Sequence, residues 1–109
     1  MNIYALKDEQ ASCWLPGTFM APNDDTAMRS VSELALQQPN IPPFKYPDVF
    51  RIYKVGTFDE THGFDFEQPL FVGTVEAVLD MALRRRKEYR AHFLETIQNA
   101  NDAEKEQKK

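Results

Sequence analysis

Residues 44–66 read FKYPDVFRIYKVGTFDETHGFDF and hold the clearest strand pattern in the chain. Side chains two residues apart share one face of a strand, so Phe50 and Ile52 would point to one side. Arg51 and Tyr53 would then point to the other side. Because aromatic and branched side chains suit a pleated, half-buried surface, the pattern predicts a strand with one face in the core.

The following residues predict that this strand turns back as a β-hairpin. Gly56 interrupts the alternation, as a glycine at a β-bulge does. Residues 59–63, DETHG, are polar and end in a glycine, which readily takes the positive φ that closes a short hairpin loop. Phe64 and Phe66 resume the alternation on the return strand. We expect the Gln68-Pro69 pair to end that strand, since proline cannot donate to a β-ladder.

Two further strands are predicted before the hairpin. Residues 2–7, NIYALK, form the first candidate, and residues 13–21, CWLPGTFMA, form the second. Pro16-Gly17 would bend or interrupt the second strand. The polar residues 8–12 between the two candidates suit a loop that joins antiparallel neighbours.

Two helices are predicted, one on each side of the hairpin. Asn23 is suited to cap the first helix, because its side chain can accept a hydrogen bond from a free backbone N–H, and this helix would end near Gln38. Four prolines between residues 39 and 47 predict an extended, non-helical crossing. Thr74 is a candidate cap for the second helix, which holds no Pro or Gly and is expected to persist to about Asn99.

The predicted fold is α+β with the order ββαββα. It has an antiparallel sheet of about four strands, a long C-terminal helix and helices mostly on one sheet face. We expect one domain over residues 1–100 and a charged, disordered tail over residues 101–109. The other sheet face would stay open, and an open face with aromatic side chains is typical of a partner or ligand surface.

Composition restricts the class of protein further. Apolar residues make up 42% of the 109-residue chain, which argues against wholesale disorder. No run of about 18 apolar residues is present to cross a bilayer, and no signal peptide is visible, so we expect a cytoplasmic protein that does not bind membranes. Cys13 is the single cysteine and cannot form an internal disulfide.

Catalytic and metal-binding patterns are lacking. His62, His92 and Cys13 lie far apart and match no metal-ligand spacing. The carboxylates around the hairpin loop have no paired nucleophile or phosphate loop beside them, and we interpret them as a solubilising tip. We therefore expect no enzyme, metal, cofactor or small-molecule substrate. These carboxylates are Asp59, Glu60, Asp65 and Glu67.

Charge is distributed unevenly along the chain, although the net charge is −4. Residues 1–74 carry five Lys or Arg and ten Asp or Glu, whereas residues 75–109 carry eight and seven. We name the basic residues of the C-terminal helix the arginine cluster. It can be a solvated face that pairs with the acidic body, a phosphate-binding site or an interface. The arginine cluster consists of Arg84, Arg85, Arg86, Lys87 and Arg90.

An apolar stripe follows the same helix and is interrupted near Arg86, where a buried unpaired charge would be costly. The part through Leu83 is expected to pack on the protein's own sheet. The second part extends beyond the sheet and predicts self-association as a homodimer. That second part consists of Tyr89, Phe93, Leu94 and Ile97.

The outward face of the hairpin strand is a second candidate for nucleic-acid binding. If Phe50 and Ile52 point inward, Arg51 and Tyr53 would lie together there, with Lys45 and Tyr46 beside them. Rings that stack on bases and cations that contact phosphates are the usual means of holding a single strand. The alternative is that Tyr53 simply covers the sheet or contacts a helix.

The chain also resembles the small non-structural accessory proteins of gokushovirus-type microviruses, which are single-stranded-DNA phages. The resemblance covers roughly the first two-thirds of the chain and depends on the order and spacing of short pieces. The C-terminal helix lies outside it, and Val49 stands where the pattern has an acidic residue. The matching pieces are Met1-Asn2-Ile3-Tyr4-Ala5, Lys7-Asp8, Leu15-Pro16, Ala21-Pro22-Asn23-Asp24, Ala27-Met28-Arg29, Phe44-Lys45-Tyr46-Pro47-Asp48-Val49-Phe50, Val55-Gly56-Thr57-Phe58-Asp59 and Thr61-His62-Gly63.

The resemblance implies a phage protein that is made in the cytoplasm of the bacterial host, is absent from the virion, and takes part in genome replication or the change to single-strand synthesis. Together with the arginine cluster, it predicts binding of single-stranded DNA. The alternative is a dimeric protein-interaction module that acts on a phage or host replication or assembly protein.

Overall fold

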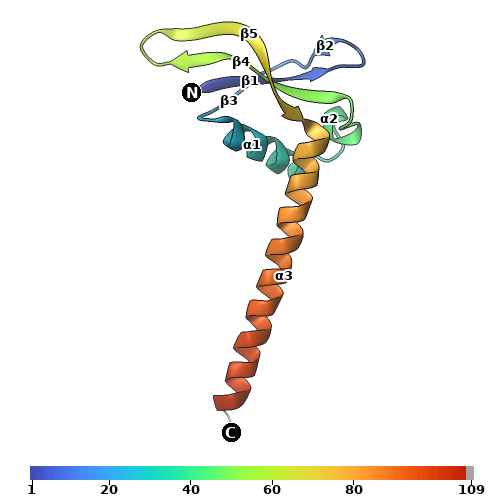
Figure 1. Ribbon diagram of the computed structural model, residues 1–109, viewed down its shortest axis with the longest axis vertical. Coiled ribbons are helices and arrows are strands. Elements are labelled where there is room, and N and C mark those ends of the chain that lie inside the picture. The colour runs from blue at the N-terminus through green and yellow to red at the C-terminus, as the bar shows by residue number, and fades with distance from the viewer. Residues whose placement is uncertain (108–109) are drawn as a thin grey trace.

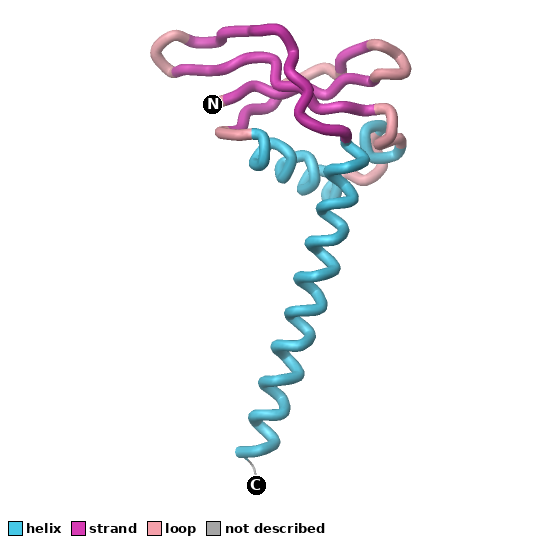
Figure 2. The backbone as a smooth tube through the Cα atoms, viewed as in Figure 1, coloured by secondary structure: helices cyan, strands magenta, loops and turns pink. Residues whose placement is uncertain are grey.

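The computed structural model describes the backbone of residues 1–107 and the side chains of residues 1–88, 90–92, 94–96, 98 and 99. A twisted sheet forms one layer, the helices lie against one of its faces, and a long helix projects from the sheet as a shaft (Figures 1 and 2). In chain order, the elements are β1 (Asn2–Asp8), β2 (Cys13–Trp14), β3 (Phe19–Ala21), α1 (Asp24–Gln37), α2 (Pro42–Lys45), β4 (Phe50–Asp59), β5 (Gly63–Thr74) and α3 (Val75–Gln107). The predicted α+β class is confirmed.

The sheet has five strands, one more than the expected number of about four. Its order is β2-β1-β4-β5, all pairs are antiparallel, and β3 also pairs with β1. Both short strands share one edge of β1, with β3 at residues 2–4 and β2 at residues 7–8. The candidate strand at residues 13–21 is therefore two strands, separated at Pro16-Gly17, where Gly17 has a φ of +93°.

The predicted hairpin is present, and so is the irregularity at Gly56. The β1–β4 ladder shifts where Ile3 lies opposite Gly56 and Tyr4 lies opposite Lys54. A Cβ atom on Gly56 would lie 2.3 Å from the carbonyl oxygen of Asp65 on β5. Only a residue without a side chain allows this approach of the two strands.

The predicted break at Gln68-Pro69 was wrong, because β5 continues through it to Thr74. Lys54 lies opposite Leu70, whereas Gly56 lies opposite Phe66, so β5 carries more residues than β4 across this step. Pro69 lies in the resulting bulge of an edge strand, a place where a residue without an N–H is tolerated.

The first helix follows its prediction, but the segment after it does not. The Asn23 side chain accepts a hydrogen bond from the backbone N–H of Thr26 at 2.8 Å, which confirms the cap. The proline-rich segment contains the short helix α2, where an extended crossing was expected. Proline is compatible with a first helical turn, since the N–H groups there need no intrahelical acceptor.

The hydrophobic core lies between one sheet face and the helices. Phe50 and Ile52 are 2% and 0% exposed, so this side of β4 is the core side, a choice that the alternation of the sequence had left open. Tyr4 is also buried, and its hydroxyl donates a hydrogen bond of 2.7 Å to Asp24 at the start of α1. Burial and this hydrogen bond raise the pKa of Tyr4. The buried core residues are Tyr4, Ala21, Ala27, Val31, Phe50, Ile52, Val75 and Val78.

Helix α3 begins in the core and then leaves it. Thr74 caps the helix, accepting a hydrogen bond from the N–H of Ala77 at 3.1 Å. Val75 and Val78 are buried beside α1, but Leu83, which was expected to pack on the sheet, is 61% exposed. The helical backbone continues past Asn99 to Gln107, so the molecule measures 67 × 37 × 19 Å. The domain boundary at residue 100 stays a prediction.

Among the helices in the described part of the chain, none combines the length and the hydropathy that spanning a bilayer requires.

Candidate nucleic-acid interface

The sheet face opposite the helices brings together side chains from four strands. Arg51 lies directly opposite Lys7 of β1, and Lys7 lies opposite Trp14 of β2. Tyr53 lies opposite Phe71 of β5. Residues directly opposite each other in an antiparallel ladder share a face, and Phe50 and Ile52 occupy the core face, so these residues are on the open one. We name this group the sheet-face cluster; it consists of Lys7, Trp14, Arg51, Tyr53 and Phe71.

The three rings of the sheet-face cluster form a continuous line of contacts, and a cation contacts each of the two outer rings. The ring centroids of Trp14 and Tyr53 are 5.3 Å apart, and those of Tyr53 and Phe71 are 6.0 Å apart, both edge to face. Lys7 Nζ lies 5.4 Å from the Trp14 centroid, and the Arg51 guanidinium lies 5.6 Å from the Phe71 centroid. Trp14 and Phe71 are 42% and 56% exposed, so both rings are accessible from solvent.

The central ring of the sheet-face cluster is held by a carboxylate. The Tyr53 hydroxyl donates a hydrogen bond of 2.5 Å to Glu9 Oε1, and the Glu9 N–H donates to the Val49 carbonyl oxygen at 2.9 Å. The hydrogen bond to Glu9, with some burial, raises the pKa of Tyr53. Only the neutral hydroxyl can donate this hydrogen bond. The bond fixes the orientation of the Tyr53 ring, which contacts Trp14 on one side and Phe71 on the other.

A second aromatic group lies toward the tip of the hairpin. Phe58 and Phe64 are paired across the strands with centroids 5.0 Å apart, and Phe64 stacks on Phe66 at 6.1 Å. Phe64 and Phe66 are 62% and 67% exposed. We name these three rings the tip ladder. Phe66 lies opposite Gly56, and Gly56 lies opposite Ile3 of β1. Ile3 precedes the core residue Tyr4 on the strand and so faces the other way, which places the tip ladder on the open face.

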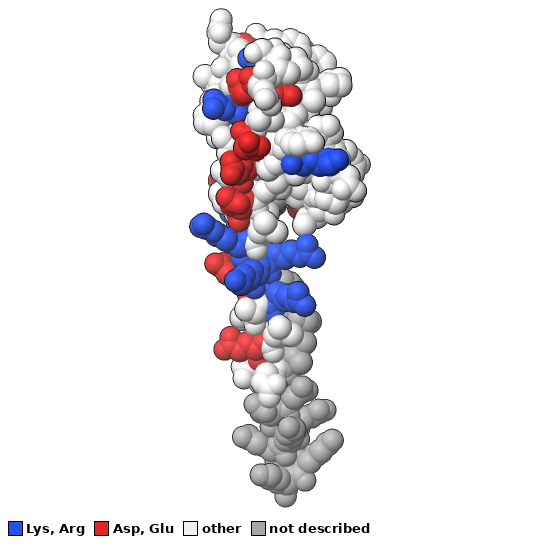
Figure 3. Space-filling view, turned by 90° about the vertical axis from the view of Figure 1, so that its right-hand side faces the viewer, with Lys and Arg blue, Asp and Glu red and all other residues white. Residues whose placement is uncertain are grey.

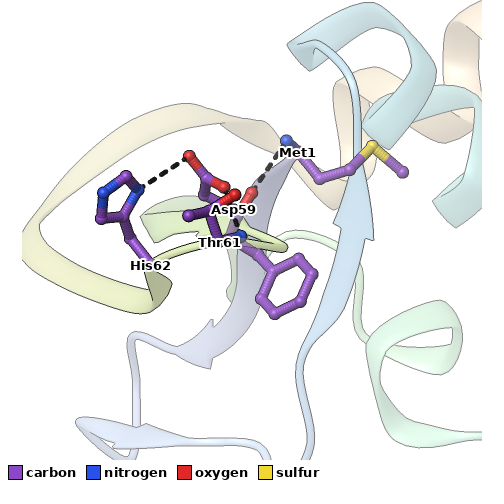
Figure 4. Close-up of polar contacts among 5 residues, drawn as sticks. Met1, Asp59, Thr61 and His62 are labelled. Carbon is purple, nitrogen blue, oxygen red and sulfur yellow. Dashed lines mark hydrogen bonds and ion pairs between the residues drawn. The ribbon is translucent and has the colours of Figure 1, made fainter.

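The hairpin loop itself is ordered by Asp59 (Figure 4). Its Oδ1 atom accepts a hydrogen bond from the Thr61 N–H at 2.7 Å, and its Oδ2 atom lies 3.3 Å from Nδ1 of His62. The Thr61 N–H and then the His62 ring lower the pKa of Asp59. The amino terminus of Met1 donates to the Phe58 carbonyl oxygen at 3.2 Å, which ties the start of β1 to the hairpin.

The structure separates the predicted nucleic-acid-binding residues into two groups. Arg51 and Tyr53 lie on the open sheet face, whereas Lys45 is in α2 and the arginine cluster is on α3, on the side of the sheet where the helices lie. The arginine cluster is exposed, and Figure 3 shows Lys and Arg side chains gathered on the shaft below a row of acidic side chains. Among the described side chains, His62 and Asp59 form an ion pair, and no residue of the arginine cluster forms one.

Sequence reasoning missed three members of the sheet-face cluster, namely Lys7, Trp14 and Phe71, and also the supporting Glu9. Lys7 and Trp14 lie within the predicted strands at residues 2–7 and 13–21, which was a partial signal. Phe71 lies beyond the predicted end of the hairpin strand, and Glu9 lies in the predicted loop, so neither was marked by the sequence. Their convergence on Tyr53 depends on the register of β1 against β2 and β4.

The predicted self-association segment lies largely outside the described side chains. This applies to Tyr89, Phe93 and Ile97. Leu94 is described and is 57% exposed. Self-association through this part of α3 therefore stays a prediction.

Fold and site define a small α+β protein with an open sheet face on which three aromatic rings contact one another and two cations. A family model described as "Phage ORF5 protein" matches residues 1–78, which include the five described strands and end at Val78, the last buried residue among the described side chains of α3. The chain belongs to this phage protein family. No curated protein and no solved structure matches it.

Proposed function

We propose that the protein binds single-stranded DNA through the sheet-face cluster and acts in phage genome replication. The observation that carries the proposal is the line of three rings, Trp14, Tyr53 and Phe71, with a cation in contact with each outer ring. Unpaired bases stack on exposed rings, and each stacked base contributes about 1 to 3 kcal/mol. Duplex DNA keeps its bases stacked on one another, so such a surface favours single strands.

The extent of the family match supports the sheet face over the shaft as the primary site. Residues 1–78 include all five residues of the sheet-face cluster, whereas the arginine cluster begins at residue 84. The arginine cluster then contributes long-range attraction for phosphate, which is screened over about 10 Å at ordinary salt. The acidic remainder of the protein limits one subunit to micromolar affinity.

The resemblance to gokushovirus-type accessory proteins supports the finer assignment. On this proposal the protein is a microvirus accessory protein that acts in the host cytoplasm, in genome replication or the change to single-strand synthesis. A protein with a stacking surface would bind the displaced or newly made strand.

Intrinsic fluorescence tests the proposal directly, because Trp14 is the single tryptophan of the chain. Titration with unlabelled oligothymidine is expected to quench Trp14 fluorescence in a saturable way, with a smaller effect from a duplex of equal length. Phe71→Ala should weaken binding by about 1 to 3 kcal/mol. Tyr46→Ala is the matched control, since Tyr46 is a 59% exposed ring at the end of α2. An unchanged Trp14 signal at low salt would refute the proposal.

A dimeric protein-interaction module remains the second candidate, and one observation favours it. Helix α3 extends far from the sheet, with Leu83 and Leu94 61% and 57% exposed. A helix without tertiary contacts is marginally stable in water. Pairing of two α3 helices would cover this surface and present two sheet faces at once, which raises apparent affinity.

A further inference from the structure

Strand β5 is a long, uncovered edge of the sheet. Within residues 1–107 it pairs with β4 alone and stands at the end of the strand order. Its residues from Phe64 to Phe71 are all exposed. An edge strand leaves backbone N–H and C=O groups unpaired along its outer side, and these groups can bind another extended chain. At the opposite edge, β2 and β3 are two and three residues long and offer much less backbone.

The usable part of this edge is the stretch from Gly63 to Glu67. Pro69 has no N–H to donate, and the register against β4 is irregular between Phe66 and Leu70. From Gly63 to Phe66 the stretch is paired regularly with β4, with Phe64 opposite Phe58 and Asp65 opposite Thr57, and Glu67 is the first residue beyond this regular part. A regular edge of this length can pair with a short extended segment of another chain.

The two faces of this stretch differ in chemistry. Phe64 and Phe66 are stacked on the open face with their rings nearly parallel, at an interplanar angle of 2°. Asp65 and Glu67 alternate with them and are directed to the opposite face, where both are exposed. Neither carboxylate forms an ion pair with a described side chain. Glu60 in the adjacent loop adds a further exposed negative charge.

We propose that residues 63–67 of β5 bind an extended segment of a partner protein in which Lys or Arg alternates with large apolar residues. The segment would add to the sheet as a further strand. Its cations would face Asp65 and Glu67, and its apolar side chains would extend the surface of Phe64 and Phe66. Opposite charges and apolar pairs on neighbouring strands stabilise strand pairing.

Charge complementarity favours this occupant over the two others that the edge could meet. A second copy of β5 would bring the carboxylates of Asp65 and Glu67 close to the same carboxylates, and like charges on paired strands are destabilising. Nucleic acid would bring phosphates toward these carboxylates. The inference does not depend on DNA binding, because the sheet-face cluster is a separate set of residues.

The test uses the full chain and a labelled short peptide that alternates Lys with Val, with fluorescence anisotropy as the readout. Asp65→Lys together with Glu67→Lys is expected to lower affinity by about tenfold or more, because it replaces attraction by repulsion. The same variant should gain affinity for a peptide that alternates Glu with Val. Glu33→Lys with Asp80→Lys is the matched control, since it changes the net charge equally at exposed helical positions and should leave most of the binding intact.

Peptide methylation separates strand addition from simple charge attraction. Two versions of the peptide carry N-methyl groups on one or the other set of alternate backbone nitrogens. Only one set faces the sheet in an added strand, so one version should lose binding and the other should keep it. Equal binding of both versions, or an unchanged affinity of the Asp65→Lys, Glu67→Lys variant, would overturn the proposal. Phe71→Ala, which tests DNA binding, should leave peptide binding unchanged.

Discussion

The hydroxyl of Tyr53, at the centre of the open sheet face, donates a 2.5 Å hydrogen bond to Glu9, which is 44 positions away in the sequence. Glu9 follows β1 directly, and its backbone N–H donates a hydrogen bond to the carbonyl oxygen of Val49, just before β4. The contact therefore ties the end of β1 to the middle of β4. It also holds the Tyr53 ring in contact with Trp14 and Phe71.

This relationship predicts a stability loss at alkaline pH. The pKa values of Tyr53 and Tyr4 are both raised above the ordinary value of 10.0, Tyr53 chiefly by the hydrogen bond to Glu9 and Tyr4 chiefly by burial. Folding thus favours the neutral hydroxyls. Their contribution is complete below the unfolded-state pKa and is lost as the pH rises through the folded-state values. In Tyr53→Phe, the alkaline fall in unfolding free energy should become shallower, as followed by denaturant melts across pH. The same alkaline fall in Tyr53→Phe and in the unmodified protein would contradict this assignment.

Phe50 and Phe58 of β4 should contribute unequally to stability, because Phe50 lies in the core and Phe58 in the tip ladder on the open face. Phe50 is 2% exposed, so Phe50→Ala should lower the free energy of unfolding by about 3 to 5 kcal/mol. Phe58 is half-buried, and Phe58→Ala should lower it by less. Glu60→Ala at the exposed loop should change it by less than about 0.5 kcal/mol. Chemical denaturation measures all three, and equal losses would show that the hairpin does not pack as described.

Gly56 should tolerate no side chain. In Gly56→Ala the new Cβ would lie 2.3 Å from the Asp65 carbonyl oxygen, so β4 and β5 would have to separate. We expect a loss of about 1 to 3 kcal/mol, as for other overpacked sites. Gly73→Ala is the control on the same pair of strands, because its Cβ would meet only the Met28 sulfur at an ordinary 3.8 Å. Thermal melts that rank the two variants the other way would refute the close approach at Gly56.

The salt dependence of DNA binding distinguishes the two basic surfaces. Each phosphate contact on a single strand contributes a log–log slope of about −0.7. If the sheet face is the primary site, Lys7→Ala with Arg51→Ala should make the slope shallower by about 1.4. Arg84→Ala with Lys87→Ala should change it less. The reverse order would assign the phosphate contacts to α3.

Self-association through α3 is the last prediction. Leu94 is exposed on the shaft, so burial against a second α3 would stabilise a dimer. Size exclusion with light scattering should give a dimer at high micromolar concentration, and Leu94→Glu should shift it to monomer. Leu36→Glu, at a similarly exposed leucine on α1, is the control. A mass equal to one chain at every concentration would rule the dimer out.

Features that depend on residues close in the chain were predictable from the sequence. The caps at Asn23 and Thr74 each involve an N–H three residues away, and the hairpin loop ends at a glycine with a φ of +78°. That Phe50 and Ile52 share one face of β4 follows from the alternation of a single strand, although the burial of that face was decided by the tertiary structure. The prolines were less informative, because proline is compatible with more than one local structure. It can occupy an extended segment or a first helical turn, as in α2, and it can end a strand or lie in a bulge, as Pro69 does in β5.

Only the tertiary structure decided which side chains share the open face. Lys7, Trp14 and Phe71 meet Tyr53 because β1 lies between β2 and β4 in one register, and no local pattern specifies that register. It results from the packing of the whole sheet on α1 and α3, since a slip of one residue would move core side chains to solvent. The same packing places the arginine cluster on the helical side of the sheet, apart from the rings of the open face.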